Sequence, residues 1–197
     1  TGDIEPSGAN SIPGWQTENN GVGNSSFTGP TNAQDGTVYA YTEATNGTTG
    51  QIWNLNSPCF TIPLNSAPYI SFYHHMLTNV VNDVVAMGYL YLDVNTNPSG
   101  VANWTTIWQD SGSNGDVWIQ NFVDLDAYAG QTIQLRFQGV RGNNFQGDRA
   151  IDNILVSTGV EASNSYCTSG SHATATASAI FGSGPYTYNW STGQSTP

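Results

Sequence analysis

The sequence contains no lysine and carries little charge of either sign. Its 197 residues include three arginines and 14 acidic residues, which gives a formal net charge of -11 at pH 7 and a charged fraction of 9%. Ordinary soluble domains are about 25% charged. A chain without lysine has no P-loop lysine, no Schiff-base lysine and no lysine-rich surface for nucleic acid. We therefore expect no nucleic acid partner, and phosphate-rich partners are repelled at long range.

Long apolar runs and the common catalytic motifs are also missing. No run approaches the ~20 residues that cross a bilayer, so no membrane span is expected. Neither a GxSxG nor an HExxH motif occurs. Asp124 and Asp126 have a spacing that a glycosidase pair could use, but acidic residues that end a strand are the simpler interpretation. We expect no catalytic residues, and a domain that serves as an accessory module of an enzyme or adhesin.

Cysteine is scarce, since Cys59 and Cys167 are the only two and lie far apart. No CxxC pair or Cys/His cluster indicates zinc. In an oxidising compartment the two could form a disulfide worth about 4–5 kcal/mol, and two unpaired thiols are the alternative. The abundance of Asn, Thr, Ser and Gly is common in secreted β-proteins. We expect a secreted or cell-surface location.

Alternating side chains predict an all-β domain over residues 1–158. In residues 131–139, Ile133, Leu135 and Phe137 share one face and polar side chains take the other, as in a half-buried strand. Residues 83–94 are apolar on both faces and predict a central strand. Shorter strands are expected at 37–43, 71–76 and 117–125. No apolar stripe with helical spacing occurs, so helix content should be minimal.

The pattern changes after residue 158. Residues 159–166 are typical of a linker, and residues 167–197 combine a Thr/Ala alternation with a Gly-Pro turn. This stretch is too short for a complete sandwich. We expect a partial second β-module or a hairpin appended to the first domain.

An ordered set of short motifs resembles one extracellular family. The set consists of Gly29-Pro30, Asp35-Gly36, Tyr39–Glu43, Leu55–Pro58, Ile70–Met76, Ile107-Trp108 with Gly112 and Trp118, Leu135–Phe137 and Ala150–Ile154. In order and spacing they resemble the MAM domain over residues 12–158. The resemblance implies a jelly-roll β-sandwich of two antiparallel sheets and a role in adhesion or recognition. Residues 185–196 resemble the start of a bacterial surface-adhesin repeat, which implies a secreted bacterial multidomain protein.

The family's cysteine pattern is not followed. The family usually has four cysteines, and Tyr69 stands where one is expected. Cys59 and Cys167 do not sit clearly on family positions, so no disulfide scheme carries over.

A structural calcium ion is expected from the acidic residues of the resembled motifs. Jelly-roll recognition modules often hold calcium where an early loop meets the last strand, and calcium requires six to eight oxygen ligands. Asp35, Glu43 and Asp152 occupy the matching positions. Asp152 is the sharpest candidate because it interrupts an apolar strand, and a buried lone carboxylate is costly. The alternative is a carboxylate satisfied by backbone N–H groups or by Arg149.

The adjacent histidines do not fit the same ion. His74 and His75 alternate faces on a strand, so they cannot chelate one metal together. We expect one to be packed and the other exposed.

The loop from residue 141 to residue 149 is the candidate ligand site. It contains Arg141, Asn143, Asn144, Phe145, Gln146 and Arg149. Its arginine forks suit carboxylate or sulfate groups, and loops on rigid scaffolds often bind ligands. The alternative is that Arg149 pairs with Asp148 or Asp152 while Arg141 is solvated.

Trp104 is the candidate stacking platform, because it lies in a turn-rich stretch. The alternative is a tryptophan that covers a sheet edge. Trp108 and Trp118 match tryptophans that the resembled family buries, so we expect them in the core.

These features favour a non-catalytic carbohydrate-binding module of a secreted polysaccharide-degrading enzyme, with a glycan chain as its partner. A protein–protein adhesion module that binds another surface protein and a structural spacer are the alternatives. An open groove shared by the 141–149 loop and Trp104 would favour the glycan.

Overall fold

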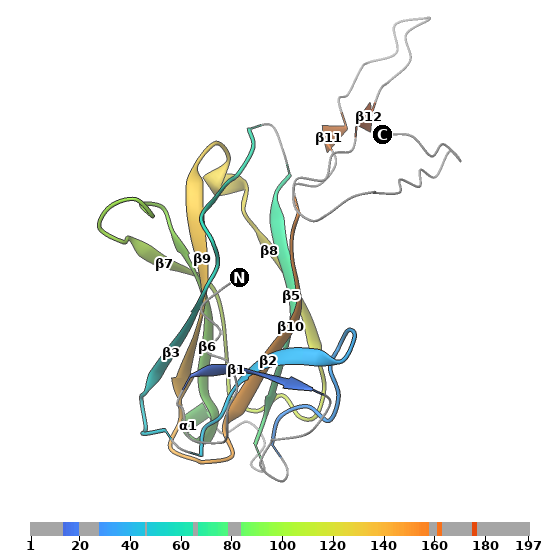
Figure 1. Cartoon of the computed structure of the whole chain (residues 1–197), viewed down its shortest axis with the longest axis vertical. Helices are drawn as coiled ribbons and strands as arrows, with labels where there is room; N and C mark the ends of the chain where they lie inside the picture. Colours follow the sequence, from blue (N-terminus) through green and yellow to red (C-terminus); the bar gives the residue numbers. More distant parts are fainter. Residues whose placement is uncertain are drawn as a thin grey trace, which may run out of the picture.

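The domain is a sandwich of two antiparallel β-sheets (Figure 1). A computed structural model describes residues 14–19, 28–45, 47–64, 67–78 and 84–157, together with the strand segments 161–162 and 175–176. The first sheet has the order β1-β2-β10-β5-β8. Its strands are β1 (Trp15–Asn19), β2 (Val38–Thr42), β10 (Asp148–Ser157), β5 (Tyr69–Leu77) and β8 (Ile119–Asp124).

The second sheet has the order β3-β9-β6-β7. Its strands are β3 (Ile52–Asn56), β9 (Thr132–Arg141), β6 (Gly88–Asn95) and β7 (Trp104–Ser111), and the short β4 (Phe60–Thr61) also pairs with β9. Helical structure among the described residues is limited to one α-helical turn, α1 (Val84–Met87), and one 3-10 turn, η1 (Asp126–Tyr128). The all-β jelly-roll prediction is confirmed.

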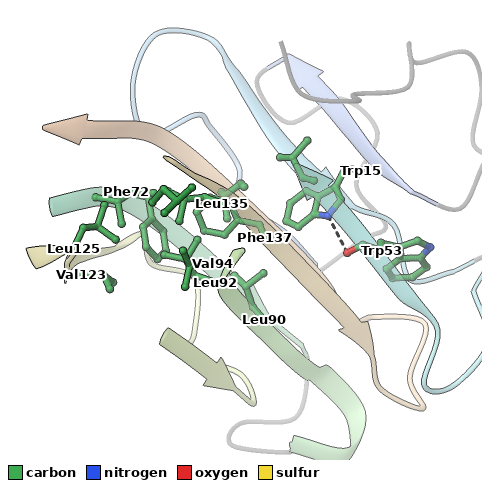
Figure 2. Packing of buried hydrophobic residues seen from close by; sticks show 14 of the residues in the cluster. Trp15, Trp53, Phe72, Leu90, Leu92, Val94, Val123, Leu125, Leu135 and Phe137 are labelled. Atoms are coloured by element: carbon green, nitrogen blue, oxygen red, sulfur yellow. Dashed lines mark hydrogen bonds between the residues drawn. The ribbon is translucent and has the colours of Figure 1, made fainter. Parts of the chain in front are cut away.

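Apolar side chains from both sheets meet in one core (Figure 2). The alternation along β9 places Ile133, Leu135 and Phe137 inward, as predicted. Across the sandwich, Phe72 of β5 packs edge-on against Phe137, with ring centroids 4.9 Å apart. Trp108 contacts the same Phe72 ring at 5.0 Å, which confirms its place in the core.

Two further tryptophans close one end of this core. Trp15 and Trp53 are both buried, and the indole N–H of Trp15 donates to the backbone carbonyl of Trp53 at 3.2 Å (Figure 2). These contacts join β1 of the first sheet to β3 of the second.

The predicted strand at 83–94 begins later than its apolar pattern suggests. Val84–Met87 form a helical turn, and β6 starts at Gly88. Gly88 has a φ of +81°, and a Cβ atom there would lie 2.1 Å from the carbonyl oxygen of Val140. The continuous apolar run hides this change of conformation, because a short buried helix and a buried strand have similar composition.

Beyond the sandwich, β11 (Glu161–Ala162) pairs with β12 (Ala175–Thr176). β11 therefore falls within the predicted linker. Cys167 and the rest of the predicted second module lie outside the described residues. Cys59 is exposed and precedes β4. Because Cys167 is not described, the pairing of the two cysteines stays a prediction. No helix among the described residues has the length and apolar character that a membrane crossing requires.

Candidate functional site

Asp152 is satisfied by backbone N–H groups. Its Oδ2 atom accepts from the amides of Gln34 at 2.8 Å and Asp35 at 3.1 Å, and its Oδ1 atom accepts from Asn153 at 2.7 Å. This is the alternative foreseen for a carboxylate in that strand. The Asp35 side chain is exposed.

Glu43 lies far from the Asp152 carboxylate. β10 pairs with β2 so that Arg149 faces Thr42, which places Glu43 beside Asp148. Asp152 is four residues further along β10, about 13 Å away at 3.3 Å per residue. No group of three His, Cys, Asp or Glu side chains suited to a metal occurs in the part of the chain that the structure describes. The structure therefore does not assemble Asp35, Glu43 and Asp152 into one site.

A different cluster, made of buried charged side chains, lies at the end of β2. Asp148 is fully buried and lies near both Arg141 and Arg149, while Glu43 is 6% exposed and lies near Arg141. The Asp148 carboxylate accepts from the backbone N–H of Ala44 and from the Thr28 hydroxyl, each at 2.7 Å. Burial and the neighbouring Glu43 charge raise the pKa of Asp148 to about 7.

The two arginines of the predicted loop are turned into this cluster. Arg141 donates to the carbonyl oxygens of Ala44 and Gly142 and is 7% exposed. Arg149 has no exposed surface and donates to the Thr42 hydroxyl and the Met87 carbonyl. Neither guanidinium can bind an anion at the surface, which corrects the predicted role of both residues. Their charge instead offsets that of the buried carboxylates.

The rest of the loop is divided between surface and interior. Asn143 and Phe145 are exposed, Asn144 is half-buried and Gln146 is 9% exposed. The loop packs on α1, because the Asn143 N–H donates to the Val85 carbonyl and the Asn144 N–H to that of Ala86.

Trp104 does not share a groove with this loop. β6 pairs Gly88 with Arg141 at one end and Asn95 with Trp104 at the other. Seven residues separate the two ends, which is about 23 Å along the strand. The loop and Trp104 therefore mark opposite ends of the second sheet.

The face of the second sheet that points away from the core joins these ends, and we call it the outer face. Side chains at its positions alternate with the buried ones on each strand. It carries aromatic rings, amides and one ion pair, supplied by Asn54, Tyr89, Tyr91, Asp93, Trp104, Thr106, Gln109, Arg136 and Gln138.

Aromatic rings occupy both ends of the outer face. Tyr89 and Tyr91 are stacked, with ring centroids 5.7 Å apart and an interplanar angle of 14°, and Tyr89 is 38% exposed. At the other end, the Arg136 guanidinium lies 4.1 Å from the centroid of the half-buried Trp104 ring. Trp104 is thus held on a sheet face and does not cover an edge.

Polar contacts fill the space between these rings. Arg136 donates to Oδ2 of Asp93 through Nε at 3.1 Å and Nη2 at 2.7 Å, while the Thr106 hydroxyl donates to Oδ1 at 2.7 Å. Alongside, the side-chain Nε2 of Gln138 donates to the side-chain Oδ1 of Asn54 at 3.1 Å. Sequence reasoning missed this face, although the alternation on β9 already placed Arg136 and Gln138 together on the outside.

Both histidines are buried, so the expectation of one exposed histidine was wrong. His74 Nε2 lies 2.7 Å from Asp110, and His75 Nε2 lies 3.0 Å from Asp116. The side chain of His75 points to the outside of the first sheet, but the Trp118 ring covers it, 5.4 Å away between centroids. Burial lowers the pKa of His75.

Comparisons with known proteins agree with this architecture. The family model described as "MAM domain, meprin/A5/mu" matches residues 7–164. MAM domain-containing glycosylphosphatidylinositol anchor protein 2 of Mus musculus is 30% identical over 162 residues, which cover 74% of this chain and 16% of that protein. The corresponding protein 1 of Gallus gallus is 33% identical over 138 residues, covering 67% and 13%.

Solved structures share the fold at low sequence identity. The K1 cleaved adhesin domain of Lys-gingipain from Porphyromonas gingivalis W83 has a TM-score of 0.52 and 14% identity, covering 74% of this chain and 84% of that one. The chain spans only 16% of the mouse protein and 13% of the chicken protein. With the family model matched over residues 7–164, the chain belongs to the MAM domain family.

Proposed function

We propose that this MAM domain is a non-catalytic glycan-binding module of an extracellular multidomain protein. The outer face of the second sheet supports the proposal, because it combines the aromatic rings of Tyr89, Tyr91 and Trp104 with a row of amides. Aromatic faces pack on the apolar faces of sugar rings, and planar polar groups beside them bind hydroxyls. Asn143, Asn144 and Phe145 remain candidate contacts near the Tyr89 end of the strands.

Affinity electrophoresis through gels that contain dissolved polysaccharides tests this function. The wild-type domain should be retarded by at least one polysaccharide of a panel. Trp104→Ala and the double change Tyr89→Ala with Tyr91→Ala should each weaken that retardation by about tenfold or more, equivalent to about 1.4 kcal/mol. Phe122→Ala is the matched control, because Phe122 is 64% exposed on the other sheet. Equal loss in the control, or no retardation of wild type by any polysaccharide, would count against the proposal.

A protein-binding role is the second candidate, and a separate patch favours it. On the outside of the first sheet, Phe122 and Leu155 both lie opposite Ser71, from the two strands that flank β5. They are 64% and 49% exposed, and Tyr69 packs against Phe122 with ring centroids 6.0 Å apart. Exposed contiguous apolar side chains often mark protein interfaces. Sedimentation of wild type and of Phe122→Ser tests whether the patch binds a second copy of this chain. If both proteins sediment as monomers, the patch does not mediate self-association.

The proposal also includes a structural calcium ion, with Glu43 and Asp148 as its candidate ligands. Asp148 accepts one hydrogen bond on each oxygen, from Ala44 and Thr28, and Oε1 of Glu43 accepts one from the Thr45 N–H, so both carboxylates keep lone pairs for a cation. Two carboxylates in a buried site suit a hard cation with oxygen ligands. Calcium should raise the melting temperature and EDTA should lower it, and Asp148→Asn should abolish the difference. An unchanged melting temperature would reject the ion.

The wider context is part of the same proposal. We infer that the domain is secreted or displayed on a cell surface, in a bacterial protein that degrades polysaccharides. The curated relatives are named as glycosylphosphatidylinositol-anchored proteins, and the chain spans 16% of the mouse protein. Sequencing the complete gene tests this context, because a catalytic domain should accompany the module.

A further inference from the structure

We infer that the ligand of the outer face is a neutral polysaccharide that lies along the strands of the second sheet. This inference rests on the proposed glycan-binding function and specifies its substrate class. The sequence predicts a carboxylate or sulfate ligand instead. The two differ because the positions of the three arginines are known only from the structure.

All three arginines are buried or paired. Arg141 and Arg149 are buried in the cluster at the end of β2. Arg136 is paired with Asp93, and the two side chains are only 15% and 4% exposed. Lysine does not occur in the sequence. Among the residues that the structure describes, no basic group is therefore free to bind a uronate or sulfate.

The outer face itself carries one ion pair whose charges cancel. Asp93 accepts hydrogen bonds on both oxygens, two from Arg136 and one from Thr106. Its charge is balanced locally, so the outer face is electrically neutral. The whole chain carries a formal charge of -11, which repels a polyanion before contact. A uronate would then lose hydration on binding and gain no ion pair.

The polar groups of the outer face match sugar hydroxyls. The amides of Gln138 and Asn54 satisfy each other with one hydrogen bond, which leaves one further acceptor and one further donor group. Gln109 is exposed beside Tyr91, whose pKa is raised by burial, so the phenol keeps its proton at neutral pH. Sugar hydroxyls both donate and accept, as these groups do.

The distance between the aromatic rings determines the length of the ligand. Tyr89 and Asn95, the partner of Trp104, are six residues apart on β6, about 20 Å along the strand. Aromatic rings at the two ends can be occupied together only by a chain of several sugar residues. A short oligosaccharide reaches one end and gains little from the other.

Affinity electrophoresis at low salt tests the substrate class with three groups of probes. The neutral probes are hydroxyethylcellulose, mannan, arabinoxylan and galactan; the polyuronates are polygalacturonate and alginate; the sulfated probe is dextran sulfate. We expect retardation by at least one neutral polysaccharide and by no polyanion, and the retardation should be unchanged at 0.5 M salt because no ion pairs are involved. Retardation by a polyanion alone would overturn this inference and keep the proposed function. Retardation by none would overturn both.

An oligosaccharide series from the retarding polysaccharide tests the chain-length argument by calorimetry. Wild-type affinity should rise about tenfold or more from the disaccharide to the longest oligosaccharide. In Trp104→Ala the gain should largely disappear, while Phe122→Ala should keep it. An affinity that does not change with length in wild type would refute binding along the strands.

Discussion

The Asp93–Arg136 pair offers the sharpest test of how the outer face is built. In Arg136→Met, the Asp93 carboxylate would lose two charge-assisted hydrogen bonds, of 3.1 and 2.7 Å, and keep only the one from Thr106. Its side chain is 4% exposed, so water replaces the lost partner poorly. Breaking a buried pair costs about 3–5 kcal/mol, whereas an exposed pair contributes about 0–1 kcal/mol. We expect about 3 kcal/mol, because Arg136 lies at the solvent side of the pair.

A double-mutant cycle separates the pair from the packing of its side chains. Asp93→Asn combined with Arg136→Met removes both charges and should cost about 1 kcal/mol, because no unpaired carboxylate remains. The coupling energy should then be about 2 kcal/mol or more. Urea unfolding followed by tryptophan fluorescence at pH 7 measures all four proteins. A loss below 1 kcal/mol for Arg136→Met, or additive single changes, would show that the pair behaves as a solvated surface contact.

Three further predictions concern the buried cluster, the core and the backbone. Burial raises the folded-state pKa of Asp148 to about 7, so the folded chain binds this proton more tightly than the unfolded chain. In EDTA, stability should therefore fall as pH rises from 5 to 7, by up to about 1.4 kcal/mol per unit, and Asp148→Asn should flatten this slope in urea titrations. In the same assay, Phe72→Ala should lower the free energy of unfolding by about 3–5 kcal/mol, because Phe72 is fully buried. Phe122→Ala should lower it by less than about 1 kcal/mol, because Phe122 is exposed. Similar losses for the two variants would contradict the assigned core. Gly88→Ala should cost more than about 2 kcal/mol, because its Cβ would meet a backbone carbonyl at 2.1 Å. Gly36→Ala should cost only about 1 kcal/mol, because Gly36 also has a positive φ but has open space around its Cβ position. Equal melting temperatures for the two variants would refute this difference.

Much of the fold could be predicted because its signals are local. The alternation of Ile133, Leu135 and Phe137 determines which face of β9 is buried, whatever strand lies beside it. The same period of two places Arg141 on the buried face, so its inward position was also available from the sequence. The polar composition of the 141–149 loop nevertheless predicts a surface role for Arg141, and the alternation of β9 outweighs it.

The candidate site could be predicted only in part, because its members come from different strands. The sequence identifies Trp104 as a candidate aromatic platform, but its neighbour Arg136 belongs to a different strand, β9. They meet because β6 pairs with both β9 and β7, with a bulge after Leu92 that sets which residues face each other. That register is not encoded in any one segment.

The sequence by itself determined the all-β class, the family and the absence of lysine, because composition and alternation are properties of the chain alone. The tertiary structure alone decided which charges meet. Asp148 and Asp152 lie in one strand, yet one is buried beside Glu43 and the other is capped by the backbone of Gln34. Strand partners more than a hundred residues away make that difference. Long-range pairing thus buried two arginines and left a sheet face with aromatic rings and no net charge.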